Sequence, residues 1–312
     1  MNLYSRRNFV KRAAGQPAAA LQAPASSAVS SSPWAARMGL ELYTVRDAIQ
    51  RDEPGTLAQV AAMGYKEVEP SVTYGGLDPK QYRALLDKLG LIAPTTHMSV
   101  TPGPDLDKQL EGHQIMGHHY TSVAEPRRTA PQTAGAARGP SPDATKRTCE
   151  IYNQVGAVGK KYGIQVLVHN HTTEFERYPG SDQCPYDVIL ATCDPDLVVM
   201  ELDIGWASVA GQDILALFHQ HPGRFVLWHV KDFMCLQYLF PQPEMTESER
   251  QHTAGKWMVP VGLGGVDYKA IFAQHELAGM KHFNIEQDSA ASWGSSIAAA
   301  HVSYTNLLRA IS

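Results

Sequence analysis

The sequence predicts a single α/β domain folded as a closed (β/α)8 barrel, and three observations support this fold class. A chain of 312 residues, 44% of them hydrophobic and 19% charged, is long enough for one large α/β domain. Strand-like and helix-like segments alternate between residues 38 and 311. Eight such repeats match the length and rhythm of a closed parallel barrel. An open, doubly wound sheet is less favoured, because no glycine-rich phosphate-binding turn follows the first strand-like segment.

The predicted strands are short runs rich in apolar and β-branched residues. They cover residues 38–43, 65–69, 91–97, 119–124, 164–168, 197–203, 225–230 and 282–286. The clearest helix between them begins at Asp78, where a capping side chain precedes a proline, and it ends at Gly90. Its apolar side chains recur with helical spacing: Tyr82, Leu85, Leu86 and Leu89.

Residues 1–32 are expected to lie outside the barrel, which occupies residues 33–312. The run Ser5-Arg-Arg-Asn-Phe-Val-Lys11 resembles the bacterial twin-arginine export signal, S-R-R-x-F-[LV]-K, at every specified position. The Ser-, Ala- and Pro-rich residues that follow are expected to be flexible. The sequence therefore predicts recognition by the twin-arginine export machinery and a periplasmic location. A disordered basic tail is the alternative interpretation.

Charge and cysteine content exclude several classes of partner and fold. The formal net charge of −4 argues against a nucleic-acid partner. No apolar run reaches the length of about 18 residues that spans a membrane. The four cysteines lack C-x-x-C spacing and are interpreted as structural or incidental: Cys149, Cys184, Cys193 and Cys235.

Ligand-type residues stand at the ends of four predicted strands. The apolar run 164–168 leads directly into His169-Asn170-His171, with Glu174 three residues further on. Three other strands end at Asp203, His229 and Glu286. In a closed parallel barrel the carboxyl ends of all strands meet at one rim, so these residues are expected to be neighbours. Imidazole and carboxylate groups together form a ligand set suited to a divalent metal.

Each of these residues also has a purely structural interpretation. Glu201 and Asp203 face the same side of their strand, so two carboxylates there require a cation nearby. Alternatively, Glu201 pairs with a basic residue deeper in the barrel and Asp203 caps the next segment. His229 after an apolar strand suits a hydrogen-bonded core group, and Glu286 suits an internal ion pair. The combination on consecutive strands favours the metal site.

Six segments carry a family resemblance that spans residues 38–310. They are LELYTVRD (40–47), VHNHTTEFE (168–176), MELDIGW (200–206), GRFVLWHVKDF (223–233), VGLGGVDYKAIF (261–272) and KHFNIEQD (281–288). Together they resemble the sugar phosphate isomerase/epimerase superfamily of xylose isomerase-like TIM barrels. The resemblance implies one divalent metal (Mn, Zn, Co, Fe or Mg) on the C-terminal rim, held by Glu, Asp, His and Glu from strands five to eight. Asp203, His229 and Glu286 match the last three.

Two positions depart from the family pattern. Where many members have Glu at the end of strand five, this chain has His169, so either His169 binds the metal or Glu174 reaches back over the loop. Leu263 stands where relatives often have an acidic residue between the glycines of V-G-x-G. Both departures bear on the chemistry rather than on the presence of a metal.

The resemblance implies proton abstraction next to a sugar or polyol carbonyl through an enediolate. The family's epimerases use two carboxylates on opposite faces of the substrate, which Glu286 and Glu174 would supply here. A lyase or dehydratase acting on a 3-keto sugar or keto-inositol needs the metal and only one base, so it stays open. Lys231 is expected to neutralise an oxyanion, with a solvated lysine as the alternative, and His97 is a further catalytic candidate.

Several other residues are candidates for substrate binding in carbohydrate metabolism. Glu69 and His171 would bind hydroxyl groups, as would His97. Trp206, Phe233 and Trp257 would offer faces for sugar stacking, although ordinary core packing is the commoner role of such residues. The sequence thus predicts an isomerase or epimerase acting on an unphosphorylated sugar or polyol. A non-catalytic sugar-binding barrel is the alternative from another class, and a homo-oligomer is compatible with the sequence.

Overall fold

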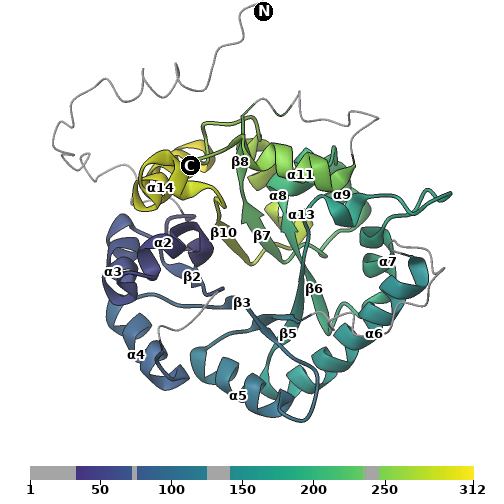
Figure 1. Ribbon diagram of the computed structural model, residues 1–312, viewed down its shortest axis with the longest axis horizontal. Coiled ribbons are helices and arrows are strands. Elements are labelled where there is room, and N and C mark those ends of the chain that lie inside the picture. Colours follow the sequence, from purple (N-terminus) through teal and green to yellow (C-terminus); the bar gives the residue numbers. More distant parts are fainter. Residues whose placement is uncertain (1–32, 72–75, 125–140, 235, 237–245) are drawn as a thin grey trace, which may run out of the picture. The chain divides into compact units, whose positions relative to one another are not determined.

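The computed structural model describes residues 33–71, 76–124, 141–234, 236 and 246–312. The predicted export signal at residues 1–32 and the thiol of Cys235 lie outside these residues. The described chain contains an eight-stranded parallel sheet with the strand order β2-β1-β10-β7-β6-β5-β4-β3 (Figure 1). The strands are β1 (Met38–Glu41), β2 (Glu67–Glu69), β3 (Thr95–Val100), β4 (Tyr120–Val123), β5 (Gln165–His169), β6 (Val198–Asp203), β7 (Leu227–Val230) and β10 (His282–Ile285).

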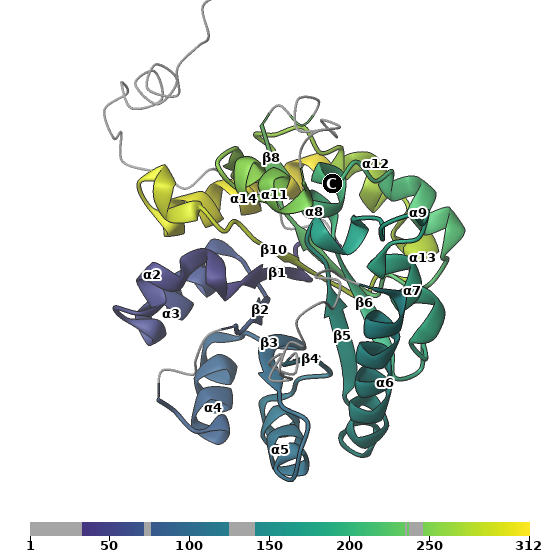
Figure 2. The ribbon, with the colours of Figure 1, turned by 45° about the vertical axis from the view of Figure 1, so that its right-hand side comes forward.

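The sheet curls into a nearly closed barrel. Between β2 and the segment before β3, Glu67 and Ile92 form a parallel bridge, and the Val68 amide donates to the Ile92 carbonyl at 2.9 Å. Helices surround the strands, as the two ribbon views show (Figures 1 and 2). They are α2 (Arg46–Ile49), α3 (Glu53–Met63), α4 (Pro79–Leu89), α5 (Leu106–Met116), α6 (Pro142–Gly159), α7 (Pro185–Thr192), α8 (Ile204–Val209), α9 (Ile214–Gln220), α12 (Tyr268–Phe272), α13 (His275–Ala278) and α14 (Ser296–Ile311). The predicted barrel fold is confirmed.

Local sequence signals explain where α4 begins and ends. Asp78 accepts a hydrogen bond from the Gln81 amide, and the Gln81 side chain accepts one from the Asp78 amide, which makes a capping box. Gly90 ends the helix in the left-handed conformation with φ 67°. The strand predicted at 91–97 instead begins at Thr95, because Pro94 has no amide hydrogen to donate to a neighbouring strand.

The segment after β7 forms a small unit of its own. Two short antiparallel strands, β8 (Asp232–Phe233) and β9 (Met258–Val259), bracket α11 (Glu247–Gly255). The Asp232 carboxylate accepts hydrogen bonds from the backbone amides of Phe233, Gly262, Gly264 and Val266 at 2.9–3.2 Å. One buried carboxylate therefore anchors the loop that follows β9 to the strand end that leads out of the barrel.

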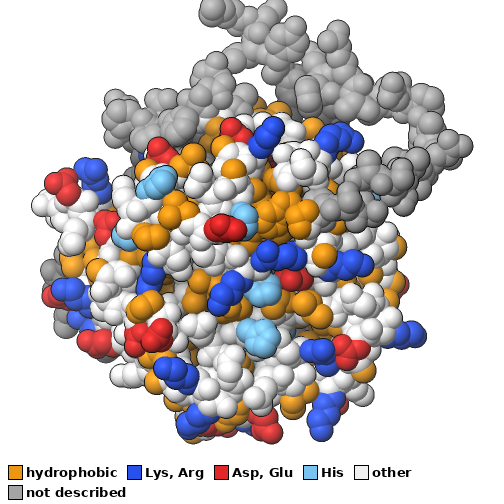
Figure 3. Space-filling model, turned by 180° about the vertical axis from the view of Figure 1, so that it is seen from behind, with side chains coloured by type: hydrophobic (Ala, Val, Ile, Leu, Met, Phe, Trp, Pro, Cys, Tyr) orange, Lys and Arg blue, Asp and Glu red, His pale blue; other side chains and the backbone are white. Residues whose placement is uncertain are grey.

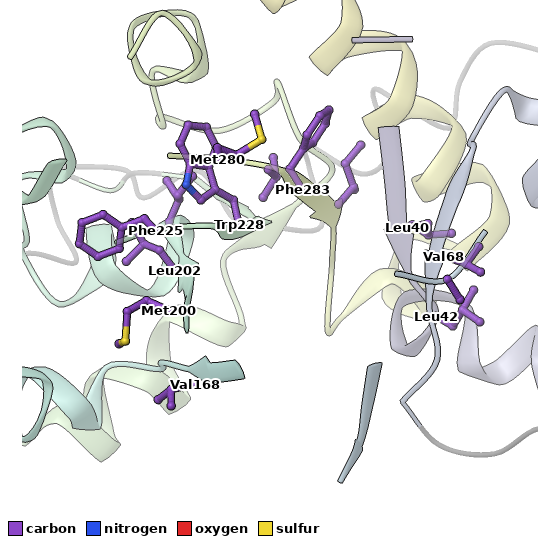
Figure 4. Packing of buried hydrophobic residues seen from close by; sticks show 14 of the residues in the cluster. Leu40, Leu42, Val68, Val168, Met200, Leu202, Phe225, Trp228, Met280 and Phe283 are labelled. Carbon is purple, nitrogen blue, oxygen red and sulfur yellow. The ribbon is translucent and has the colours of Figure 1, made fainter. Parts of the chain in front are cut away.

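Alternation along each strand separates an apolar outer layer from a polar interior. Met200, Leu202 and Trp228 face the helices and have no exposed surface (Figure 4). Truncating a buried side chain of the size of Trp228 costs about 3–5 kcal/mol. At the amino end of the barrel the inward-facing residues Leu167, Val199 and Leu227 are apolar and pack with Tyr120 and Val226. Towards the carboxyl end they become carboxylates and imidazoles.

The outer surface gives no sign of a dominant charge on the face seen in Figure 3. Lys and Arg side chains there are interspersed with Asp and Glu side chains. In the part of the chain that the structure describes, no helix combines the length and the apolar character needed to cross a membrane.

Candidate metal centre

An inner layer of the site surrounds the Glu201 carboxylate, which is fully buried on β6. Its Oε2 lies 2.5 Å from His97 Nε2 and 3.1 Å from His169 Nδ1. Its Oε1 lies 3.4 Å from His229 Nε2. The three imidazoles come from β3, β5 and β7, and their ring centroids are 4.6–5.1 Å apart. One carboxylate on β6 thus contacts imidazoles from three other strands of the barrel.

Glu69 on β2 completes this layer and is held from two sides. Its Oε2 lies 2.6 Å from His229 Nε2 and accepts a hydrogen bond from Asn284 Nδ2 at 3.0 Å. Asn284 also donates to the Thr95 hydroxyl at 3.1 Å. Gly39 on β1 makes room for this amide, because a Cβ there would lie 2.0 Å from Asn284 Oδ1. Contacts across β1, β2, β3, β7 and β10 therefore fix the Glu69 carboxylate.

An outer layer lies at the carboxyl ends of β6, β7 and β10, centred on the Lys231 ammonium. Lys231 Nζ lies 2.9 Å from Glu286 Oε2, 2.9 Å from Asp288 Oδ1 and 3.2 Å from Asp203 Oδ2. Glu286 Oε2 is also 2.7 Å from His229 Nδ1. Asp203 Oδ2 is 3.7 Å from His169 Nε2. Each of the two histidines His169 and His229 thus has one ring nitrogen near an inner carboxylate and the other near an outer one.

The inner layer holds opposite charges in close contact. Burial raises the pKa of Glu201, but the imidazoles of His229 and His97 outweigh it, and the pKa lies well below the usual range. Burial lowers the pKa of His97, but Glu201 and Glu69 raise it to about 9. His169 differs, because burial and the charge of His229 lower its pKa well below the ordinary value. A neutral imidazole at His169 has a lone pair available for a ligand.

The outer layer is dominated by the lysine. Burial lowers the pKa of Lys231, but the charges of Asp203, Asp288 and Glu286 more than compensate and raise it well above its usual value. Burial raises the pKa of Glu286, but Lys231 and His229 bring it well below the ordinary value. Asp288 has a pKa raised to about 6, chiefly by burial. Lys231 is therefore a protonated ammonium in this site, and Glu286 is an ionised carboxylate.

Glu174 is hydrogen-bonded within the loop that follows β5. Its Oε2 accepts a hydrogen bond from the His171 amide at 2.6 Å, and its Oε1 accepts one from the Thr173 hydroxyl at 3.1 Å. Both contacts lie within its own loop.

The ring of His171 lies between those of His169 and Trp206, with centroid distances of 4.9 and 6.1 Å. Burial lowers the pKa of His171 to about 4, so it faces the site as a neutral group.

Two residues expected to bind substrate hydroxyls, Glu69 and His97, have contacts within the inner layer. Glu69 has no exposed surface and contacts His229. His97 directs Nε2 to Glu201, although 23% of its side chain remains exposed. Glu201 itself shows the deeper pairing with basic residues, and Asp203 Oδ1 caps α8 by accepting from the Trp206 amide at 2.7 Å. Glu201 is thus paired with basic residues and Asp203 caps a helix, as their structural interpretations predicted. Both carboxylates also belong to the cluster of ligand-type residues.

The three aromatic candidates differ in position. Trp206 is buried beside Lys231, whose Nζ lies 5.6 Å from the centre of the ring. Phe233 has no exposed surface and packs against Trp206 with a centroid distance of 4.9 Å. Phe233 therefore supports Trp206 and does not offer a stacking face. Trp257, between α11 and β9, has 40% of its surface exposed.

Glu41 and Asp288 belong to the site but were not among the predicted site residues. Glu41 ends β1 and is buried, and burial and the nearby charge of Glu286 raise its pKa well above the ordinary value. Asp288 contacts Lys231. Both could have been found from the alternation of side chains along a strand, since residues two apart face the same side. Glu41 is two residues after Gly39 on β1, and Asp288 is two residues after Glu286.

The donor atoms of the two layers fit a divalent metal. One group contains His97, His169, Glu201 and His229, and another contains Asp203, His229 and Glu286; within each, the ligand atoms lie within 4.8 Å of one another. Three of the buried oxygens accept no hydrogen bond of normal geometry among the described residues, and each has only a charged group nearby: Glu69 Oε1, Glu201 Oε1 and Asp203 Oδ2. Imidazole nitrogens with carboxylate oxygens suit zinc, manganese, iron or cobalt.

Comparison with known families agrees with this geometry. Residues 57–299 match the family described as xylose isomerase-like TIM barrel. The chain belongs to this family. Solved structures share the fold across nearly the whole described barrel. A sugar phosphate isomerase/epimerase from Parabacteroides distasonis is 22% identical with a TM-score of 0.67, covering 91% of this chain and 98% of that one.

Two further proteins are similar to this chain. An IolI protein with a bound zinc atom is 13% identical with a TM-score of 0.61, covering 88% of this chain and 98% of that one. An inosose dehydratase from Halalkalibacterium halodurans is 26% identical over 146 residues, which are 46% of this chain and 46% of that protein. The match thus spans about half the length of this curated relative.

Proposed function

We propose that this protein is a divalent-metal-dependent dehydratase that removes water from a keto-polyol or keto-sugar. The observation that carries the proposal is the contact of 2.9 Å between Lys231 Nζ and Glu286 Oε2 beside the metal-binding group. A protonated amine and an ionised carboxylate next to each other supply the acid and the base that a β-elimination needs.

Four residues would hold the metal. His169 would offer Nε2 and His229 would offer Nδ1, because their other nitrogens face Glu201. Asp203 and Glu286 would each offer an oxygen. His169 rather than Glu174 completes the set in this proposal, because Glu174 is hydrogen-bonded within its own loop. A divalent metal bound there supplies the positive charge that polarises a substrate carbonyl and stabilises an enolate oxygen.

The side chains of this protein would carry the proton transfers. Glu286 takes the proton from the carbon next to the carbonyl. Lys231 gives a proton to the hydroxyl group on the following carbon, which leaves as water while a carbon–carbon double bond forms. The proton on Glu286 then returns to Lys231 across their contact. The enol product converts to a dicarbonyl compound, so the substrate equals the product plus one water.

An isomerase or epimerase is the second candidate, because it shares the first proton abstraction. It needs a base on each face of the substrate, and Glu174 was the predicted second base. The hydrogen bonds of Glu174 to His171 and Thr173 favour the one-base reaction instead. The partial similarity to inosose dehydratases supports the same choice.

A substrate panel in deuterated water tests the proposal. Keto-inositols and 3-keto sugars would be incubated with the metal-loaded protein and followed by NMR. Elimination gives a product lighter by one water, whereas an epimerase returns an isomer that carries deuterium. A protein that binds these sugars without metal, exchange or product would be a non-catalytic barrel and would overturn the enzyme proposal.

We also propose that residues 1–32 direct export to the periplasm, and that the substrate there is unphosphorylated. The support is the twin-arginine motif alone. Replacing Arg6 and Arg7 with Lys should retain the full chain in the cytoplasm of a bacterial host, as measured by cell fractionation. Equal periplasmic amounts of both forms would refute the export proposal.

A further inference from the structure

We infer that Glu201 is a positioning residue that determines which ring nitrogen of His169 faces the metal. The inference rests on the proposed metal site. Glu201 lies two residues before Asp203 on the same side of β6, so it occupies the layer directly beneath the proposed ligands. It is fully buried, and its oxygens contact three imidazoles.

The geometry gives Glu201 control over one histidine in particular. An ionised carboxylate accepts hydrogen bonds but donates none, so His169 must carry its proton on Nδ1 to bond to Oε2 at 3.1 Å. That choice leaves the lone pair on Nε2, which lies 3.7 Å from Asp203 Oδ2. If the tautomer were reversed, Nε2 would carry a hydrogen atom and could not bind a metal.

His229 is protected by a second carboxylate. Its Nε2 lies 2.6 Å from Glu69 Oε2 as well as 3.4 Å from Glu201 Oε1, so Glu69 keeps the Nε2 proton in place without Glu201. For His169, Glu201 is the only carboxylate near Nδ1 among the described residues. Loss of the Glu201 charge should therefore leave the tautomer and ring orientation of His169 unfixed, while Glu69 keeps His229 in its orientation.

The Glu201→Gln variant provides the test. A glutamine amide carries no charge and accepts at only one of its two ends, so its donating nitrogen must face either the N–H groups of His97 and His169 or that of His229. The affinity for zinc, measured by competition with a chromophoric chelator, should fall on the order of 10–100-fold. The cobalt-loaded variant should also change its visible spectrum, because the ligand set changes.

Glu67→Gln is the matched control. Glu67 is another buried glutamate of the barrel interior, and its Oε2 lies 2.8 Å from His282 Nδ1. His282 begins β10 and is not a proposed ligand. The control removes the same kind of carboxylate–imidazole contact, so any general loss of stability is shared, while its zinc affinity should match that of the unmodified protein.

Three outcomes separate the inference from the function it rests on. If the unmodified protein binds no divalent metal, the proposed metal site fails. If it binds zinc and Glu201→Gln binds equally well, the positioning role of Glu201 is wrong. Should Glu201→Gln not fold, histidine nitrogen NMR of the zinc-loaded unmodified protein decides: we expect the His169 proton on Nδ1, and a proton on Nε2 would overturn the inference.

Discussion

The side chain of Asn170 holds the backbone of Asp203 through two hydrogen bonds. Asn170 Oδ1 accepts from the Asp203 amide at 3.0 Å, and Asn170 Nδ2 donates to the Asp203 carbonyl at 3.2 Å. Asn170 follows β5 and has no exposed surface. The end of β6 is therefore held at the point where Asp203 offers one oxygen to α8 and the other to the outer layer.

Removing this pair of bonds should weaken metal binding as well as stability. For Asn170→Ala we expect the free energy of unfolding to fall by about 2 kcal/mol, since two buried backbone groups lose their partner. Zinc affinity should fall on the order of tenfold, because Asp203 is no longer held in place. Denaturant unfolding and chelator competition measure the two quantities.

A second asparagine provides the control for that variant. Asn153 on α6 makes the same pair of contacts, accepting from the Asp194 amide at 2.9 Å and donating to the Thr192 carbonyl at 3.3 Å. Asn153→Ala should also lower stability, by less because Asn153 is only half-buried, and should leave zinc affinity unchanged. Equal losses of affinity in both variants would show that stability alone explains the effect.

Replacing Lys231 should separate proton exchange from elimination. Lys231→Met keeps the length of the side chain and removes the acid, so the leaving hydroxyl has no proton donor. We expect solvent-deuterium exchange next to the carbonyl to persist while elimination falls on the order of 10²–10⁴-fold. Zinc affinity should not fall, because a positive charge beside Asp203 and Glu286 has been removed. Parallel loss of exchange and elimination would refute the role of Lys231 as the acid.

Gly39 should tolerate no side chain. A Cβ there would lie 2.0 Å from Asn284 Oδ1 and 2.8 Å from the Phe283 carbonyl oxygen. Gly39→Ala must displace Asn284 from Glu69, so we expect a loss of about 2–4 kcal/mol of stability and weaker zinc binding. Gly255→Ala, at the end of α11 with nothing within 4 Å of the added Cβ and no positive φ, controls for the general effect of replacing a glycine. A fully stable Gly39→Ala protein would contradict the packing.

The protein should lose stability as the pH falls below about 6.5, partly through two buried histidines. Burial lowers the pKa of His118 to about 3 and that of His113 to about 4. Because the unfolded chain binds protons at a higher pH than the folded one, this contribution is complete above the unfolded pKa and declines as the pH falls towards the folded values.

His118→Asn isolates this effect, because the amide can still donate to the Ala93 carbonyl that lies 2.6 Å from His118 Nδ1. We expect the decrease in the free energy of unfolding between neutral pH and about pH 5 to be smaller by about 2 kcal/mol in the variant. Urea unfolding at the two pH values measures it. An unchanged decrease would mean that the pKa of His118 in the folded protein is not lowered relative to the unfolded chain.

Removal of the metal should lower the melting temperature reversibly. A ligand present at about 100 times its dissociation constant stabilises the folded state by about 2.7 kcal/mol. Dialysis against a chelator should therefore lower the melting temperature by several degrees. Zinc, manganese or cobalt should restore it better than magnesium, because two imidazoles are poor ligands for magnesium. A melting temperature insensitive to chelator and to zinc would contradict the metal site.

The sequence alone determined the barrel and the inward face of its strands. The alternation of Met200, Glu201, Leu202 and Asp203 predicts which side chains face the interior, and parallel strands bring Asp203, His229 and Glu286 to one rim. These features depend on local periodicity, which can be recognised within a single short segment of the sequence. The resemblance of six segments to a known family indicates the same three residues as metal ligands.

Only the tertiary structure decided which groups touch. Strand register pairs His169 with Glu201 and Asp203 with His229, so His169 contacts both layers while Glu174 bonds within its own loop. The three carboxylates around Lys231 come from β6 and from the residues that follow β10. Alternation gives the face of a residue but not its height in the barrel, because height depends on the stagger of strands that are distant in sequence.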